Sequence, residues 1–244
     1  MSDAAITVRP SSGLSFGTAA ALLVALLVLT VPACWAAGAI YGGDKEVASN
    51  TLWSMFCLVY AGILALPWLN LKGQENLSRA QRLEKMCVAW ICLTVGPHLT
   101  WELPWVLAYP TIMAAKGELW SYAWWAYMDG GDLRYVTRDV CVLAMETGAS
   151  VIGITGAIIL FQRRKTKLLT DNQLLVLMAL MVADFYPTYM YYVTEIHQGL
   201  PNVSGMTNLM VKFIGANSFW LVMPWVVFLW AGRQLTSRRT DAGR

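Results

Sequence analysis

A histidine and a glutamate stand four residues apart in the apolar stretch GPHLTWELPW, residues 96–105. Residues at this spacing share one face of a helix, so His98 and Glu102 are expected to point the same way. A third ionisable residue, Glu146, lies within another apolar stretch. Because ionisable side chains are costly in lipid and usually face a cavity or a partner, these three residues predict a buried acid–base site.

The depths of these residues in their segments predict that they meet. Glu102 lies seven residues before the end of one expected span, and Glu146 lies seven residues after the start of the next. At a rise of 1.5 Å per residue, both carboxyl groups would lie roughly 10 Å below the same membrane surface. His98 is one turn deeper, and Asn217 lies about ten residues into the last span, with Trp220 on its face at i+3.

Two carboxyl groups in one apolar pocket should not both be ionised, because burial and mutual repulsion disfavour the second charge. One protonated acid beside one carboxylate forms a general acid–base pair, which is the chemistry predicted here. The alternative is that these polar groups bond to one another and only specify helix packing. For Asp184, midway along another span, we expect packing with a tyrosine such as Tyr186, although it could be a third acid of the pocket.

The composition indicates an all-α, polytopic membrane helix bundle. The 244 residues are 57% hydrophobic and 14% charged, against about 25% charged in soluble domains. The net charge of +3 gives no indication of nucleic-acid binding. Six segments reach the roughly 20 apolar residues that a span needs: 17–40, 51–69, 86–109, 139–161, 172–195 and 207–231.

Basic residues predict the orientation of these spans. If the N-terminus is cytoplasmic, 13 of the 18 Lys and Arg residues fall on the cytoplasmic side, as the positive-inside rule expects. Both termini are then cytoplasmic, with a disordered tail at 1–16 and a basic tail at 236–244. Alternatively, the first segment is a cleaved signal sequence and five spans remain. The expected membrane is the endoplasmic reticulum in a eukaryote, or the inner membrane in a bacterium.

The loop at about 110–138 is rich in aromatic residues. These form either an interfacial belt or a lid over the mouth of a cavity. They are Trp120, Tyr122, Trp124, Trp125 and Tyr127.

Four motifs occur in the order found in a known family: HLTWE (98–102), GGDLRYVTRD…AMET (130–147), YYVTE (191–195) and NSFWLVMP (217–224). Over residues 51–235 the chain resembles the emopamil-binding protein family, the sterol 8,7-isomerases of the EXPERA superfamily. The resemblance implies a five-span core, to which the span at 17–40 is an addition.

The resemblance also implies an activity. A cavity open to the bilayer would hold a sterol whose 8,9 double bond moves to the 7,8 position with no cofactor, using His98, Glu102 and Glu146 for proton transfer. The carbocation intermediate needs carboxylates or aromatic faces nearby. The residues expected to bind the substrate are Asn217, Trp220, Trp101, Tyr135 and Trp124. With only two histidines in the chain, a metal site is not expected.

The chain departs from the family pattern at two places. Ala149 stands where the family has a threonine, and Pro187-Thr188 stands where it has a glycine–aspartate pair. A related polycyclic terpenoid, isomerised or cyclised through a similar carbocation, would use the same acid–base residues. The further alternative is a non-enzymatic lipid-binding protein of the superfamily. The partners expected are a sterol or terpenoid substrate, the lipid bilayer and a second copy in a homodimer, which is plausible for the family.

Overall fold

The computed structural model describes residues 13–166 and 168–242, and these residues form helices with no β-strand among them. The long helices are α1 (Phe16–Trp35), α2 (Lys45–Ala65), α3 (Arg79–Pro97), α4 (Leu103–Ala114), α7 (Val140–Thr166), α8 (Asp171–His197) and α10 (Ala216–Ala242). Shorter α-helices are α5 (Tyr122–Gly131), α6 (Arg134–Thr137) and α9 (Gly205–Asn208). Turns of 3-10 or π-helix are η1 (Ala36–Ile40), η2 (Leu66–Trp68), η3 (His98–Glu102), η4 (Leu119–Ser121) and η5 (Leu209–Gly215).

The predicted all-α membrane bundle is confirmed. Among the described residues, five helical stretches are long and apolar enough to cross a membrane: Phe16–Ile40, Lys45–Trp68, Val140–Thr166, Asp171–His197 and Gly205–Thr240. The sixth expected span, 86–109, falls within the continuous stretch from α3 through η3 to α4. That stretch carries His98 and Glu102 at its centre and packs against α7 and α10. Its crossing of the bilayer stays a prediction.

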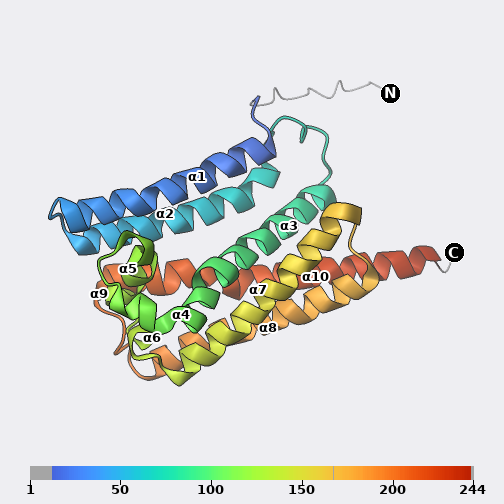
Figure 1. Ribbon diagram of the computed structural model, residues 1–244. Coiled ribbons are helices and arrows are strands. Elements are labelled where there is room, and N and C mark those ends of the chain that lie inside the picture. The colour runs from blue at the N-terminus through green and yellow to red at the C-terminus, as the bar shows by residue number, and fades with distance from the viewer. Residues whose placement is uncertain (1–12, 167, 243–244) are drawn as a thin grey trace.

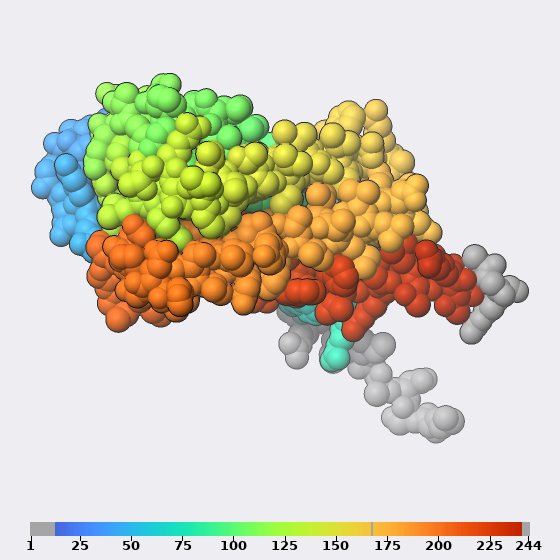
Figure 2. Space-filling model, turned by 90° about the horizontal axis from the view of Figure 1, so that it is seen from below, coloured from blue at the N-terminus to red at the C-terminus, as the bar shows by residue number. Residues whose placement is uncertain are grey.

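The helices lie side by side in one bundle (Figure 1). α1 pairs with α2 along one side, and α8 packs against both α7 and α10. Figure 2 looks onto the face where α7 and α8 run together, with the C-terminal part of α10 projecting beyond them. α1 begins and α10 ends at the same end of the bundle.

The predictions for the terminal segments have different outcomes. Most of the tail predicted at 1–16 lies outside the described residues. At the other terminus α10 continues to Ala242, so the described part of the basic segment 236–244 is helical. The division into a core at 51–235 and an added span at 17–40 stays a prediction.

Side chains at the helix starts fix where the long helices begin. Asp44 accepts hydrogen bonds from two backbone amides at the first turn of α2. Ser78 with Gln81 forms a capping box at α3, and Thr170 with Gln173 forms another at α8. These side chains satisfy amides that the first helical turn leaves without a partner.

Proline shapes the helix that carries the predicted histidine. Pro97 has no amide hydrogen, so the carbonyl of Leu93 loses its usual helical partner. The Tyr60 hydroxyl donates to this carbonyl at 2.9 Å and joins α2 to α3. The next five residues form the π-turn η3, a geometry that is frequent at functional sites.

Two glycines let α7 approach this turn closely. A Cβ on Gly153 would lie 2.6 Å from the Cβ of His98, and one on Gly156 would lie 2.6 Å from a methyl group of Val95. Such distances are shorter than any ordinary carbon contact. The backbone of α7 therefore packs directly against the residues around His98.

The aromatic loop contributes to the core. Trp124, Trp125 and Tyr127 of α5 are buried and pack in a cluster with Trp105, Tyr191 and Phe213. Trp120 is 52% exposed and is the member of the group that suits an interfacial belt. Most of the aromatic residues of this loop are therefore part of the core at one end of the bundle.

Candidate active site

A cavity of about 420 Å³ lies between α2, α3, α7, α8 and α10. This volume is within the range of roughly 300–1,000 Å³ that is typical of small-molecule sites. Its wall is mainly apolar and includes Val24, Leu27 and Val31 of α1. Seven of the eight predicted site residues line it: His98, Glu102, Glu146, Asn217, Trp220, Trp101 and Tyr135.

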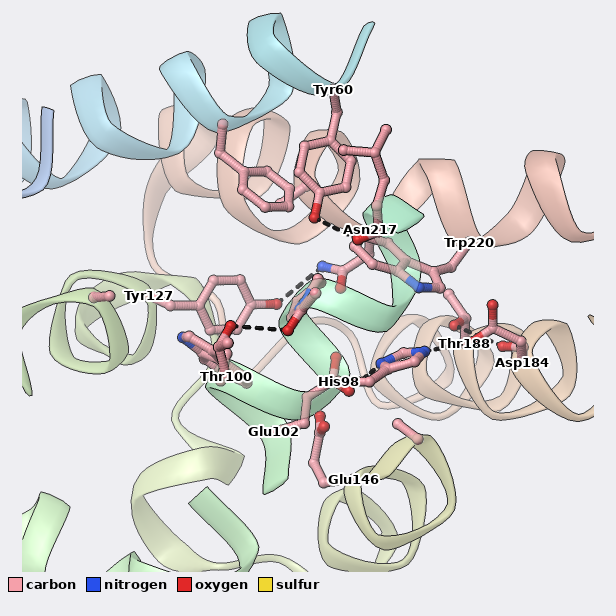
Figure 3. A pocket seen from close by; sticks show the side chains of 18 of the residues that line it. Tyr60, His98, Thr100, Glu102, Tyr127, Glu146, Asp184, Thr188, Asn217 and Trp220 are labelled. Carbon is pink, nitrogen blue, oxygen red and sulfur yellow. Dashed lines mark hydrogen bonds and ion pairs between the residues drawn. The ribbon is translucent and has the colours of Figure 1, made fainter. Parts of the chain in front are cut away.

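His98 is buried and bonded on both ring nitrogens. Nδ1 contacts the Glu102 carboxylate, and Nε2 lies 3.0 Å from Oδ1 of Asp184 (Figure 3). With a carboxylate at each nitrogen, an imidazolium could donate one N–H to each side. The arrangement can therefore store a proton within reach of Glu102.

The expectation that Asp184 packs with Tyr186 is wrong. Tyr186 is 59% exposed, whereas Asp184 is buried, lines the cavity and bonds to His98. The Thr94 hydroxyl lies 3.2 Å from Oδ2 of Asp184 and accepts the Trp220 indole N–H at 2.8 Å. Asp184 is thus the second carboxylate of the histidine, and Thr94 links the pair to the predicted substrate-binding tryptophan.

Glu146 enters the cavity from α7 with a separate partner. Its carboxylate accepts a hydrogen bond from the Tyr135 hydroxyl of α6, eleven residues before it in the chain. Burial and the neighbouring carboxylate raise the pKa of Tyr135 well above its usual value, so this group stays a donor. Figure 3 shows the Glu146 side chain directed toward Glu102, which brings the two predicted carboxyl groups together.

A buried ion-pair network holds the segment that carries Tyr135. Arg134 lies 2.6 Å from Asp132 and 3.3 Å from Glu195, and neither carboxylate is exposed to solvent. Glu195 also accepts two hydrogen bonds from Asn202, at 2.8 and 3.0 Å. The motifs that contain Arg134 and Glu195 are both visible in the sequence. The ion pair between them is not, because about 60 residues separate the two motifs.

Of the remaining predicted residues, Asn217 lines the cavity and Trp124 packs behind its wall. Asn217 donates to the Tyr127 hydroxyl at 2.9 Å, so it joins α10 to α5 instead of bonding to an acid. Trp124 does not line the cavity, contrary to its predicted role in substrate binding. Its indole N–H is 2.9 Å from the carbonyl of Trp101 and its ring stacks on the Trp101 ring, so it supports the wall from behind.

The positions that depart from the family pattern also face this space. Ala149, Pro187 and Thr188 all line the cavity. The differences noted in the sequence therefore alter the surface that a bound molecule would touch. They leave the acids and the histidine in place.

Comparison with curated proteins identifies the relatives of this chain. It is 24% identical over 187 residues to 3-beta-hydroxysteroid-Delta(8),Delta(7)-isomerase of Mus musculus, covering 75% of this chain and 78% of the mouse protein. An Arabidopsis thaliana protein named "Probable 3-beta-hydroxysteroid-Delta(8),Delta(7)-isomerase" is 24% identical over 163 residues, covering 66% and 69%. These relatives support the resemblance to the emopamil-binding protein family.

Another plant relative is named as a synthase instead of an isomerase. Protoglabretal synthase of Citrus sinensis is 24% identical to this chain over 155 residues, covering 63% of this chain and 72% of the Citrus protein. No family model matches the chain. The resemblance seen in the four motifs is thus supported by relatives that align over most of its length.

Proposed function

We propose that this chain is a membrane-embedded isomerase that moves the 8,9 double bond of a sterol, or of a related triterpenoid, to the 7,8 position. The observation that carries the proposal is the pairing of two carboxyl centres in one apolar cavity. One centre is Glu102 with His98 and Asp184, and the other is Glu146 with Tyr135. The names of the mouse and Arabidopsis relatives support the same reaction.

The reaction needs one proton donor and one proton acceptor. A proton added to C9 uses the electron pair of the 8,9 double bond and leaves a positive charge at C8. Loss of a proton from C7 then returns the electron pair of that C–H bond and forms the 7,8 double bond. Protons and charge balance, so the transfer requires no cofactor.

We assign one proton to Glu102 assisted by His98, and the other to Glu146. An imidazolium between two carboxylates can replenish a proton on Glu102, which suits this pair to shuttle protons. The carbocation would form among carboxylates and the aromatic faces of Trp101 and Trp220, which stabilise positive charge. We expect Asn217 to orient the substrate, together with Tyr127 to which it is bonded.

The decisive experiment is an incubation of the purified protein with an 8,9-unsaturated sterol in deuterated water, followed by mass spectrometry. One deuterium at C9 in a 7,8-unsaturated product is expected. Glu102→Gln and Glu146→Gln should each abolish turnover and still fold, whereas Glu118→Gln in an exposed loop should not affect it. Full turnover by both cavity variants would refute the assignment.

A second candidate is cyclisation or rearrangement of a polycyclic terpenoid by the same acids. Two observations favour it: the synthase name of the Citrus sinensis relative, and the two places in the cavity wall where the chain departs from the family pattern. Products with new rings would identify this reaction. A sterol that binds tightly and returns unchanged after long incubation would instead indicate a non-enzymatic lipid-binding protein.

The membrane setting is also part of the proposal. We place both termini in the cytoplasm, in the endoplasmic reticulum of a eukaryote or the inner membrane of a bacterium. α1 begins and α10 ends at the same end of the bundle, which supports placing both termini on one side of the membrane. The distribution of basic residues supports the cytoplasmic side. Homodimer formation is a further proposal, and cross-linking in native membranes would test it.

A further inference from the structure

A second cavity, of about 330 Å³, lies at the opposite end of the bundle from the chain termini. It is formed where α1 ends and α2 begins, with α5 and α9 as its other walls. The short connection between two spans lies at this point, so the cavity sits at the expected surface of the membrane. It shares no lining residue with the acid–base cavity.

The residues that line this second cavity carry charges of both signs, and the buried ammonium of Lys212 lies behind the wall, bonded to Ser49 and to the carbonyl of Asp129. Lys45 and Lys116 supply two cations, and Glu46 and Asp129 supply two carboxylates. Lys116 lies 2.9 Å from Asp129 and also over the ring of Trp125, with 4.3 Å to the centroid. A wall with both charges suits a zwitterionic group better than a simple anion or cation.

An amide oxygen on the wall lacks a donor. The Nδ2 group of Asn208 donates to Glu46 at 3.0 Å and to the Ser204 carbonyl at 2.7 Å, which fixes the orientation of the amide. Its Oδ1 atom is then buried with no hydrogen-bond partner among the described residues, and Asn208 is only 2% exposed. A buried acceptor without a donor is costly, so a ligand that supplies an N–H here would stabilise the site.

A hydroxyl on the same wall lacks an acceptor. The Tyr122 oxygen is buried and has no partner in the described part of the chain, and Tyr122 lines this cavity. Burial raises the pKa of Tyr122 to about 12, so the group is a neutral donor at physiological pH. It complements the cations in binding an anionic oxygen.

We propose that this cavity binds the headgroup of a phosphoethanolamine lipid. The phosphate would lie against Lys45 and the Tyr122 hydroxyl, and the primary ammonium would donate to Asn208 Oδ1 and to the carboxylate of Glu46. A choline headgroup carries no N–H and cannot make the second contact. Ile40 and Val47 follow the lining residues Ala39 and Glu46 in the chain and are 59% and 62% exposed, so they offer apolar surface to the acyl chains.

The site shares a wall with the proposed active site. Tyr122, Trp125 and Asp129 of α5 line the headgroup cavity, whereas Ala123 and Tyr127 of the same helix line the acid–base cavity. A bound headgroup would therefore hold in place the helix that closes one end of the substrate cavity. The lipid proposal itself does not depend on the reaction, because it concerns binding alone.

The test is native mass spectrometry of the full chain released from nanodiscs that contain equal amounts of phosphatidylethanolamine, phosphatidylcholine and phosphatidylglycerol. The expected result is one retained phosphatidylethanolamine per chain. Tyr122→Phe removes a hydroxyl that bonds to nothing in the described protein, so it should leave the fold intact. We expect it to lower retention about fivefold, with at least tenfold for Tyr122→Phe combined with Lys45→Gln.

The matched controls lie outside the cavity. Tyr41→Phe changes a tyrosine that is 82% exposed, and Lys165→Gln changes a lysine in the last turn of α7, so both should retain the lipid as wild type does. Equal retention of the three lipids would overturn the proposal, as would unchanged retention in the double variant. If the protein bound soluble glycerophosphoethanolamine as tightly as phosphatidylethanolamine, the proposal would also be overturned, because the ligand would then not need to come from the bilayer.

Discussion

Substitution of Gly153 by alanine is the sharpest test of how the fold positions His98. The alanine Cβ would lie 2.6 Å from the His98 Cβ and 3.3 Å from the carbonyl carbon of His98. Carbon atoms in ordinary contact are about 3.5–4.0 Å apart. Either α7 must move away from α3, or the turn η3 that carries His98 must shift, by about 1 Å.

The consequences for stability and for catalysis should differ in size. An overpacked methyl group costs about 1–3 kcal/mol, and replacing glycine with alanine within a helix returns about 1 kcal/mol. The net loss of stability is thus at most about 2 kcal/mol. A displacement of about 1 Å at a catalytic group can lower the rate about 100-fold, so activity should fall much further than stability.

The assay combines turnover of the 8,9-unsaturated sterol with thermal unfolding of the same sample. Gly148→Ala is the control, because Gly148 lies on the same helix and a methyl group added there would have no heavy atom within 4 Å. We expect this control to keep full activity and to be slightly more stable. If Gly153→Ala were as active as Gly148→Ala, close packing of α7 would not be what positions the histidine.

Three further predictions concern the acid–base cavity. Tyr135→Phe removes the hydroxyl that donates to Glu146 and should lower kcat about 10- to 100-fold in steady-state assays. This factor corresponds to the roughly 1.5–3 kcal/mol that a hydrogen bond to a charged group contributes. An unchanged kcat would contradict the pairing of Tyr135 with Glu146. Val31→Trp places an indole in the cavity wall and should weaken binding of a fluorescent sterol by at least tenfold, whereas Val28→Trp, at a position that is 61% exposed, should bind it normally. A polycyclic amine that is protonated near the position of C8 should compete with substrate, because it mimics the carbocation. In a competition assay Glu102→Gln should reduce the affinity for this amine about tenfold, since the ammonium then has one carboxylate fewer beside it. If an uncharged analogue bound as tightly as the amine, this would count against a cationic intermediate.

The sequence allowed the composition of the site to be predicted better than its connections. His98 and Glu102 share a helix, so their contact follows from spacing alone, and the depth of Glu146 could be counted from the ends of the apolar segments. The role of Asp184 could not be obtained in this way. It depends on how α8 is rotated about its axis, and depth along a helix carries no information on rotation.

The aromatic residues show the same difference between local and long-range information. Trp101 follows from its place in the HLTWE motif, but Trp124 packs behind it because α5 folds back over η3. The lining contributed by Val31 of α1 could not be predicted either, because the motifs are confined to residues 51–235. Contacts between segments far apart in the chain require the packing of whole helices to be known.

The ion-pair network around Arg134 has a consequence for the order of events during synthesis. Asp132 and Arg134 are made together, but Glu195 follows about 60 residues later, which at about 5–20 residues per second is a delay of roughly 3–12 s. Until Glu195 arrives with α8, the segment that presents Tyr135 to Glu146 lacks its second carboxylate. A nascent chain that stops before α8 therefore holds Arg134 with one of its two carboxylates, and it also lacks Asp184, the second carboxylate of His98.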